Sequence, residues 1–294
     1  MDLNDEALHR HAGPRVQQRP HGGRIRTAYL FIVPDCSPAS YGAPSSIPTL
    51  PLAIIPIAID LFGSVVSTAQ APSIPLPLLI LIGVAQNLGM LAVMVFVGLK
   101  LGQKLGLGAP LLDGWLAGNS VTNQWRASLR VSFREGLIAG VGIGVVLLIA
   151  LLAVVPLIPN LPFVTAAKLA VWKRLLACFY GGLYEEILTR LFLVTLIAWL
   201  ANKVFRKANA QLAPAAFWIS NLVVAILFGL GHLPSASLVM PITPLVVAVA
   251  LSFNGIAAVV FGALYRKRGL EAAMIAHFTA DFVIYVVGPA FLAT

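Results

Sequence analysis

The chain has 294 residues, of which 59% are hydrophobic and only 11% are charged. A soluble globular domain carries about 25% charged residues, so the composition excludes an ordinary soluble protein. The net charge of +9 would suggest nucleic-acid binding in a soluble protein. Here the basic residues lie in short stretches between apolar runs, where they set the topology of membrane proteins. Nucleic acid is therefore excluded as a partner.

Residues 1–47 contain five arginines, scattered Pro, Gly and Ser, and only one short apolar patch. This composition is typical of a disordered basic arm. An over-extended start or an organelle-targeting segment is the alternative interpretation. The rest of the chain, 48–294, is expected to form one transmembrane domain.

Seven apolar runs are long enough to cross a bilayer, which takes about 20 residues. In chain order they are Thr49–Val66, Leu76–Leu99, Gly136–Ile158, Leu175–Leu200, Pro214–Leu230, Leu238–Leu264 and Leu270–Leu292. The stretch Pro162–Arg174 is apolar but shorter and basic, which indicates a helix at the membrane interface. The predicted fold class is all-α, a polytopic transmembrane bundle of about seven or eight helices.

Basic residues are abundant in alternate loops. They lie before Thr49, between Lys100 and Arg134, at 203–207 and at 266–268. The positive-inside rule places these loops and the N-terminus in the cytoplasm. Lys168, Lys173 and Arg174 fall on the opposite side and are the exception. We expect a multi-pass protein of the plasma membrane, the inner membrane if the source is bacterial.

Three charged residues, Glu185, Glu186 and Arg190, interrupt the apolar run Leu175–Leu200. Each costs about 2.5–3.5 kcal/mol to insert, so such residues are seldom kept without a use. Glu186 and Arg190 are four residues apart and are expected to pair on one helix face, with a purely structural role as one interpretation. Glu185 points about 100° away and lacks such a partner. It is therefore the better candidate for chemistry.

Two further polar clusters lie in separate spans. Phe228 and His232 end one span, and His277 and Asp281 lie four residues apart in the last span, on one helix face. A lone membrane histidine is more often a structural group. Because groups so costly to bury tend to meet in one polar cavity, an acid pair, a histidine and a histidine–acid pair on three helices favour a shared site.

The three motifs are Glu185-Glu186-x-x-x-Arg190, Phe228-x-x-x-His232 and His277-x-x-x-Asp281. In this order they resemble the signature of the type II CAAX prenyl endopeptidase family, also called the CAAX protease and bacteriocin-processing family. Its members are intramembrane glutamic peptidases. The resemblance covers roughly Leu175–Val287, whereas the N-terminal half offers only generic membrane helices.

The resemblance implies an intramembrane endopeptidase that performs CAAX-type C-terminal processing or related peptide processing. Its substrate would be a peptide or protein, which is lipid-modified in the CAAX case. Its other partners would be membrane lipids. By motif position, Glu185 and His232 would activate the attacking water. His277 and Asp281 would stabilise the oxyanion. No cofactor is implied.

The resemblance also assigns Glu186 and Arg190 to supporting the site. Asp281 departs from the family pattern, which usually has Asn there. An amide donates hydrogen bonds to an oxyanion, whereas an ionised carboxylate can only accept them. Asp281 would therefore act in a protonated form, or would accept from His277 and hold that ring as the donor. We favour the second role.

Two alternatives use the same residues. Two histidines and a glutamate also form a known catalytic zinc set, although the sequence has no H-E-x-x-H helix. Intramembrane Glu, His, Arg and Asp also build proton relays, so a proton-coupled transporter or a non-enzymatic membrane interaction protein is the other alternative.

Overall fold

The computed structural model describes residues 76–158, 161–205 and 212–292. The predicted arm, 1–47, and the predicted span Thr49–Val66 lie outside these residues. Within the described ranges every regular element is a helix and there is no strand, which confirms the all-α prediction.

The α-helices, in chain order, are α2 (Leu76–Leu105), α3 (Pro110–Leu116), α4 (Asn123–Val154), α5 (Pro162–Ala167), α6 (Val171–Phe179), α7 (Thr195–Phe205), α8 (Pro214–Gly231), α9 (Leu233–Ser237), α10 (Pro244–Arg268) and α11 (Leu270–Asp281). Three segments have the wider π-helical turn: η2 (Tyr180–Glu185), η3 (Ile187–Val194) and η4 (Phe282–Val287). Two short 3-10 helices are η1 (Asn119–Val121) and η5 (Gly288–Phe291).

Six helices of the described chain are long and apolar enough to cross a membrane, namely Leu81–Leu105, Asn123–Val154, Val171–Phe205, Pro214–Ser237, Pro244–Arg268 and Leu270–Phe291. Each corresponds to one predicted span. Large apolar side chains cover the outside of the bundle; Leu81 and Ile149, for example, are 63% and 64% exposed. Such a surface is stable only against lipid tails. The protein is a multi-pass integral membrane protein.

The start of α4 corrects the predicted span Gly136–Ile158. The helix begins at Asn123, where the Thr122 hydroxyl accepts a hydrogen bond from the backbone N–H of Trp125 at 3.1 Å. Its first turns carry exposed arginines, including Arg126 and Arg130. A helix does not end where its apolar run ends, because polar turns continue into the headgroup region.

The predicted interfacial helix Pro162–Arg174 is wrong as a single element. Helix α5 ends at Ala167, and the chain is extended at Ala170 before α6 starts at Val171. Arg174 therefore belongs to the first turn of a membrane-spanning helix. Its Nη1 atom donates to the backbone oxygen of Tyr285 at 3.0 Å and ties α6 to η4.

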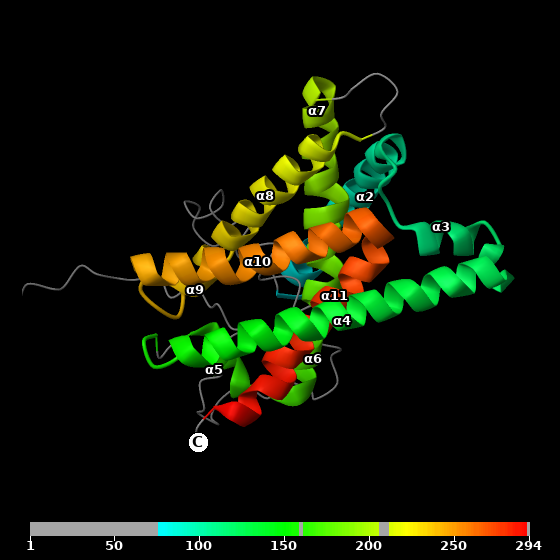
Figure 1. Cartoon of the computed structure of the whole chain (residues 1–294). Helices are drawn as coiled ribbons and strands as arrows, with labels where there is room; N and C mark the ends of the chain where they lie inside the picture. The colour runs from blue at the N-terminus through cyan, green and yellow to red at the C-terminus, as the bar shows by residue number, and fades with distance from the viewer. Residues whose placement is uncertain (1–75, 159–160, 206–211, 293–294) are drawn as a thin grey trace, which may run out of the picture.

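The segment from α6 to α7 is one continuous helix, which crosses the bundle beside α8 and α11 (Figure 1). Helix α11 packs along α4 through a stripe of small residues, in which Gly136, Gly140 and Gly144 of α4 face Ala272, Ala276 and Ala280 of α11. Such pairs allow two backbones to approach closely. They fix the position of α11, which carries His277 and Asp281.

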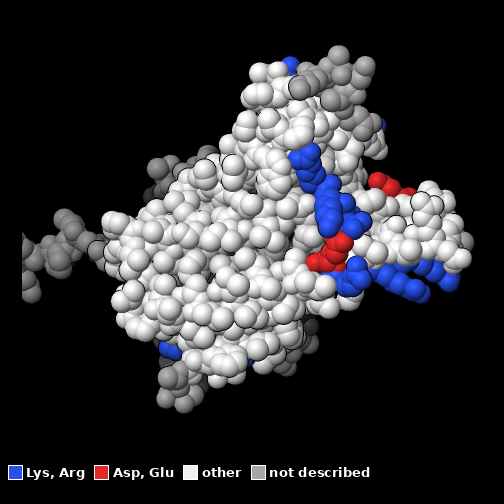
Figure 2. All heavy atoms as spheres, in the orientation of Figure 1, with Lys and Arg blue, Asp and Glu red and all other residues white. Residues whose placement is uncertain are grey.

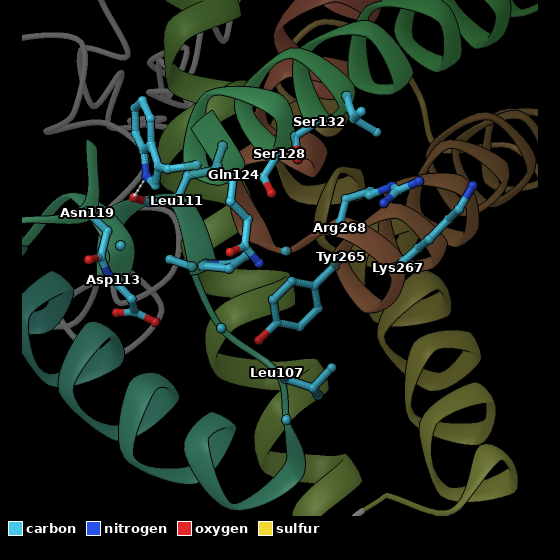
Figure 3. A pocket seen from close by; sticks show the side chains of 18 of the residues that line it. Leu107, Leu111, Asp113, Asn119, Gln124, Ser128, Ser132, Tyr265, Lys267 and Arg268 are labelled. Atoms are coloured by element: carbon cyan, nitrogen blue, oxygen red, sulfur yellow. Dashed lines mark hydrogen bonds between the residues drawn. The ribbon is translucent and has the colours of Figure 1, made fainter. Parts of the chain in front are cut away.

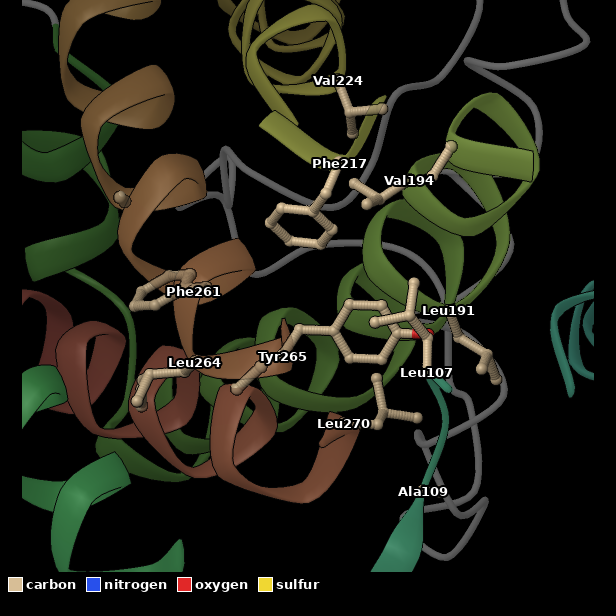
Figure 4. Packing of buried hydrophobic residues seen from close by; sticks show 14 of the residues in the cluster. Leu107, Ala109, Leu191, Val194, Phe217, Val224, Phe261, Leu264, Tyr265 and Leu270 are labelled. Atoms are coloured by element: carbon tan, nitrogen blue, oxygen red, sulfur yellow. The ribbon is translucent and has the colours of Figure 1, made fainter. Parts of the chain in front are cut away.

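The bundle has two distinct ends. At the basic end, α2, α7 and α10 finish and α4 and α11 begin; Lys and Arg side chains gather there on the face shown in Figure 2. A dense apolar core lies just inside this end, with Tyr265, Phe217 and Leu191 at its centre (Figure 4). At the opposite end, called the α9 end below, a second apolar cluster joins α9 to α5 and η4.

Candidate active site

The helix that carries the first motif is wound unusually at that motif. Segment η2 ends at Glu185 and η3 begins at Ile187, so both acids sit between wide turns. The Thr189 hydroxyl donates to the backbone oxygen of Glu185, and the Thr195 hydroxyl donates to that of Arg190 at 3.1 Å. These hydroxyls bind carbonyls that wide turns leave poorly paired. π-turns inside helices are frequent at functional sites.

Glu186, Arg190 and His277 form a fully buried layer. The Oε1 atom of Glu186 is 3.1 Å from Nη1 of Arg190 and 2.7 Å from Nδ1 of His277. The ion pair that the four-residue spacing predicts is therefore formed, and the carboxylate also reaches across to α11. A carboxylate oxygen accepts, so Nδ1 of His277 is the donor in this contact.

Aromatic rings and a backbone carbonyl complete the surroundings of Arg190. Its guanidinium carbon lies 5.5 Å from the ring centre of Phe228 and 5.5 Å from that of Phe261. Its Nη2 atom donates to the backbone oxygen of Ala258 at 3.0 Å, and its Nη1 atom also donates to the Thr189 hydroxyl. Cation–π contacts strengthen when they are desolvated, so this charge is held by the fold as well as by Glu186.

Glu185 and Asp281 form a second, more open layer beside the first. The Nε2 atom of His277 is 3.7 Å from Oε2 of Glu185 and 3.6 Å from Oδ2 of Asp281. Their side chains are 21% and 17% exposed, against 7% for His277. Glu185 thus finds on α11 the partner that it lacks on its own helix. The two carboxylates thus converge on one ring nitrogen, and both are more exposed than the ring.

Gly181 allows the backbone of η2 to lie close to Asp281 and His277. A methyl group at Gly181 would clash with the Asp281 carboxylate and would lie 3.0 Å from Nε2 of His277. The backbone of η2 therefore forms one wall of the site at van der Waals distance. Gly182 allows the same close approach to α11, where a methyl group would lie 2.8 Å from Cβ of Phe278.

His232 reaches the other residues through Phe228. It caps the end of α8, and its Nδ1 atom is 2.7 Å from the backbone oxygen of Phe228. A carbonyl oxygen only accepts, so Nδ1 carries the proton and Nε2 of a neutral ring is left as an acceptor. The Phe228 ring packs edge-on against His232 and His277, with ring centres 4.7 Å and 6.1 Å apart.

The structure thus brings five predicted site residues into direct contact, the acid–histidine cluster of Glu185, Glu186, Arg190, His277 and Asp281. It adds residues that the sequence analysis missed. Gly181 lies just before the first motif, where a Gly-Gly pair could have indicated close packing. Phe261 stacks on His277 with ring centres 4.8 Å apart, and an apolar residue in an apolar span gave no signal.

Metal binding and a separate cavity are the other ways in which the described chain could form a site. No group of three or more His, Cys, Asp or Glu side chains in it could hold a metal ion. A cavity of about 880 Å³ opens at the basic end, among Gln124, Tyr265 and Lys267 (Figure 3). None of the motif residues lines that cavity, so it is not the place where their chemistry would occur.

Comparison with known proteins identifies the same region. Residues 167–283 match the family model described as type II CAAX prenyl endopeptidase Rce1-like. The match includes all three motifs and ends just after Asp281. No curated protein and no solved structure is significantly similar to the chain.

Proposed function

We propose that this protein is an intramembrane endopeptidase that hydrolyses a peptide bond of a membrane-associated substrate, because residues 167–283 match the model of the Rce1-like type II CAAX prenyl endopeptidases, a protease family. The observation that carries the proposal is the convergence of Glu185 and Asp281 on Nε2 of His277. These two carboxylates are the partly exposed side of a cluster that is otherwise buried.

Glu185 is the proposed general base. It is the more exposed of the two adjacent acids, and Arg190 neutralises Glu186 rather than Glu185. Its carboxylate would take a proton from the attacking water as the water oxygen bonds to the scissile carbonyl carbon. It would return that proton to the amine nitrogen as the tetrahedral intermediate collapses and the C–N bond breaks. His232 would orient the same water through Nε2, because its Nδ1 proton is held by Phe228. General-base catalysis typically contributes about 10²–10⁴-fold in rate.

His277 is the proposed oxyanion donor. Its Nδ1 proton points to Glu186, so Nε2 faces the partly exposed carboxylates of Glu185 and Asp281. To donate from Nε2 as well, the ring must carry both protons. The carboxylates of Glu186, Glu185 and Asp281 surround it and compensate that positive charge. A donor fixed before the reaction begins stabilises a tetrahedral oxyanion by several kcal/mol.

Asp281 is proposed to act on His277 rather than on the oxyanion itself. Its Oδ2 atom faces Nε2 of His277 across 3.6 Å. An ionised carboxylate there would repel an oxyanion but would favour the charged ring that donates to it. The supporting residues are Glu186 and Arg190, which hold the other side of the ring.

The family name suggests the finer substrate class, CAAX-type processing of lipid-modified C-termini, and related peptide processing fits the same site. We place the protein in the plasma membrane, with the surrounding lipids as its other partners. The proposed mechanism uses no cofactor.

The proposal is tested with a substrate trap. Wild-type protein and Glu185→Gln are purified in detergent and incubated with a membrane extract, and products are identified by mass spectrometry. Glu185→Gln is expected to bind the substrate but cleave it about 10²–10⁴-fold more slowly. The matched control is Glu135→Gln, which changes a carboxylate at the basic end and should keep wild-type turnover. Near-normal cleavage by Glu185→Gln would remove it as the base.

The alternatives are separated in the same preparation. Cleavage that persists with a chelator supports glutamate catalysis, whereas stoichiometric zinc with chelator-sensitive cleavage would establish the zinc peptidase. Ion flux in liposomes without any cleavage would establish the transporter.

A further inference from the structure

The cavity at the basic end is separate from the acid–histidine cluster, and its walls are held in place by specific contacts. Its volume of about 880 Å³ is within the range of roughly 300–1,000 Å³ that is typical of small-molecule sites. Helix α3 forms one wall. The Nε1 atom of Trp125 donates to the backbone oxygen of Leu111 at 2.9 Å. The Oε1 atom of Glu271 accepts from the backbone N–H of Leu112 at 2.8 Å. Helices α4 and α11 therefore fix the α3 wall.

The cavity lies at the depth of the lipid headgroups. Helix α4 has 32 residues, whereas about 20 are enough to cross a bilayer. Its apolar run begins at Gly136, and its cavity-lining residues all come before that point. On α10 the lining residues are those at the very end of the helix, Tyr265–Arg268. Both walls therefore extend beyond the hydrocarbon core into the headgroup region.

The α10 wall of the cavity is basic. The Nζ atom of Lys267 lies 3.0 Å from Oε2 of Glu135, and Nη2 of Arg268 lies 2.7 Å from Oε1 of the same carboxylate. One acid thus pairs with two cations and neutralises only one of them. Arg266 also lines the cavity; its guanidinium carbon lies 4.9 Å from the ring centre of Phe217, and it forms no ion pair within the described chain. Positive charge is therefore in excess on this wall.

The α4 wall carries a row of uncharged polar side chains. Gln124, Ser128 and Ser132 are four residues apart, so they share one helix face, and all three line the cavity (Figure 3). None of the three side chains has a hydrogen-bond partner within the part of the chain that the structure describes. Buried polar groups are nearly always hydrogen-bonded, and Ser132 is 4% exposed. The contents of the cavity must therefore supply its partner.

From the excess of cations on one wall and the unpaired hydroxyl and amide groups on the other, we propose that this cavity binds the headgroup of an anionic phospholipid. The phosphate would lie between Lys267 and Arg268 on α10 and the hydroxyls of Ser128 and Ser132 on α4. Cations bind phosphate oxygens through charge-assisted hydrogen bonds, and basic pockets between transmembrane helices bind lipid headgroups. The site is distinct from the proposed peptidase site, and its argument does not depend on cleavage.

Asp113 narrows the class of headgroup. It lies across the cavity from Lys267 (Figure 3). With Glu135 it gives the cavity two carboxylates against three cations, a balance that suits one negative charge. A carboxylate accepts hydrogen bonds from hydroxyl groups, so a hydroxyl-bearing headgroup such as that of phosphatidylglycerol fits both sides. The position at headgroup depth favours a lipid over free phosphate as the source of the anion.

Native mass spectrometry of the delipidated full-length protein in detergent tests the site. The probe is phosphatidylglycerol. Phosphatidylcholine is the comparison without net charge, and glycerol phosphate is the free source of the same anion. Wild-type protein is expected to bind phosphatidylglycerol about ten-fold more tightly than phosphatidylcholine, the ratio that one hydrogen bond to a charged group typically gives. Glycerol phosphate should bind far more weakly than the lipid, because it lacks the acyl chains that anchor the headgroup.

Variants locate the binding in the cavity. Lys267→Gln and Ser128→Leu should each weaken phosphatidylglycerol binding about ten-fold, because the first removes a cation and the second fills the cavity. Gln124→Leu is a second cavity variant in case Ser128→Leu fails to fold, which the melting temperature reports. The matched controls are Arg130→Gln, on α4 but outside the cavity lining, and Lys173→Gln, in the first turn of α6 at the α9 end. Both should bind as the wild type does.

Three outcomes would overturn the proposal. Equal losses in Arg130→Gln and Lys267→Gln would mean that the lipid binds through general surface charge. Wild-type affinity in folded Lys267→Gln and cavity variants would place the lipid elsewhere. Glycerol phosphate that binds as tightly as phosphatidylglycerol would assign the cavity to a free phosphate compound. None of these measurements uses cleavage, so a failure of the peptidase proposal would leave the lipid site standing, and the reverse also holds.

Discussion

Two arginine–carboxylate pairs in this protein have similar distances and very different surroundings. Arg190 and Glu186 meet at 3.1 Å with side chains 1% and 0% exposed. Arg268 and Glu135 form two contacts, at 2.7 Å and 3.0 Å, with side chains 35% and 20% exposed. The Arg268–Glu135 pair has the better hydrogen-bond geometry. Only the Arg190–Glu186 pair is buried enough that breaking it would cost much free energy of unfolding.

The difference shows that distance alone does not rank ion pairs. Around Glu135, water and Lys267 can replace a lost partner, and exposed pairs typically contribute about 0.2–1 kcal/mol. The guanidinium that pairs with Glu186 is enclosed by two aromatic rings. Loss of one partner would leave a bare charge in an apolar bundle. Glu186 also holds a ring nitrogen of His277. Loss of the Arg190–Glu186 pair would therefore also disturb the proposed oxyanion donor.

The largest expected effect is that of Arg190→Ala. It should lower the free energy of unfolding by about 3–5 kcal/mol, because it removes the guanidinium partner of the buried Glu186, and should abolish cleavage. The measurement is thermal unfolding in detergent together with the cleavage rate. An unchanged melting temperature would mean that water or another group compensates Glu186.

A companion variant separates charge from packing. Glu186→Gln with Arg190→Met removes both charges and keeps most of the volume, so it should recover much of the lost stability. It should not recover cleavage, since the ionised acceptor for His277 is gone.

The next effect tests whether His232 and the acid–histidine cluster serve one site. His232→Ala and His277→Ala should each reduce the cleavage rate by about 10²–10⁴-fold. The double variant should be little worse than either, because groups that act on one transition state are not additive. Additive losses would show that the two spans do not serve one site.

The six spans of the described chain were predictable from the sequence because the bilayer imposes a simple requirement, an apolar run of about 20 residues. The ends of the helices were less so. Helix α4 continues past its apolar run through Arg126 and Arg130, and nothing in hydrophobicity requires a helix to stop there. The break at Ala170 depends on backbone conformation, which composition does not report.

Part of the cluster was predictable from spacing. Four-residue intervals bring Glu186 to Arg190 and Asp281 toward His277 on ordinary helix geometry. The contact from Glu186 to His277 was not predictable, because it depends on how two helices face each other and on the wide turns of η2 and η3. The role of Asp281 remains a prediction.

A smaller effect is expected from Gly181→Ala. The added methyl group would meet Asp281 and His277. Overpacking typically costs about 1–3 kcal/mol, and here it would displace proposed catalytic residues. The cleavage rate should fall about ten-fold or more, which corresponds to an activation free energy at least about 1.4 kcal/mol higher. The matched control is Gly142→Ala, where a methyl group meets nothing within 4 Å. Equal effects of the two substitutions would mean that the approach at Gly181 is not functional.

Asp281→Asn should have a smaller effect still. The amide oxygen can accept from His277 and the amide nitrogen can donate, so substantial cleavage should remain. Asp281→Leu offers neither and should lose nearly all of it, with little change in melting temperature. The measurement is the cleavage rate of both variants beside wild type. A fully active Asp281→Leu protein would remove Asp281 from the site.

The smallest effect is expected at the peripheral pair, where Arg268→Gln should change the free energy of unfolding by no more than about 1 kcal/mol and leave cleavage intact. Ionic strength sharpens the contrast with Arg190. At 1 M salt the screening length falls to about 3 Å, so the small cost of Arg268→Gln should vanish as salt is raised. The cost of Arg190→Ala should persist, because ions do not enter the buried layer to screen Glu186. The measurement is the melting temperature of both variants across a salt series. If both costs declined in parallel, Glu186 would be in contact with solvent ions. Salt would then screen the Arg190–Glu186 pair as it screens the Arg268–Glu135 pair.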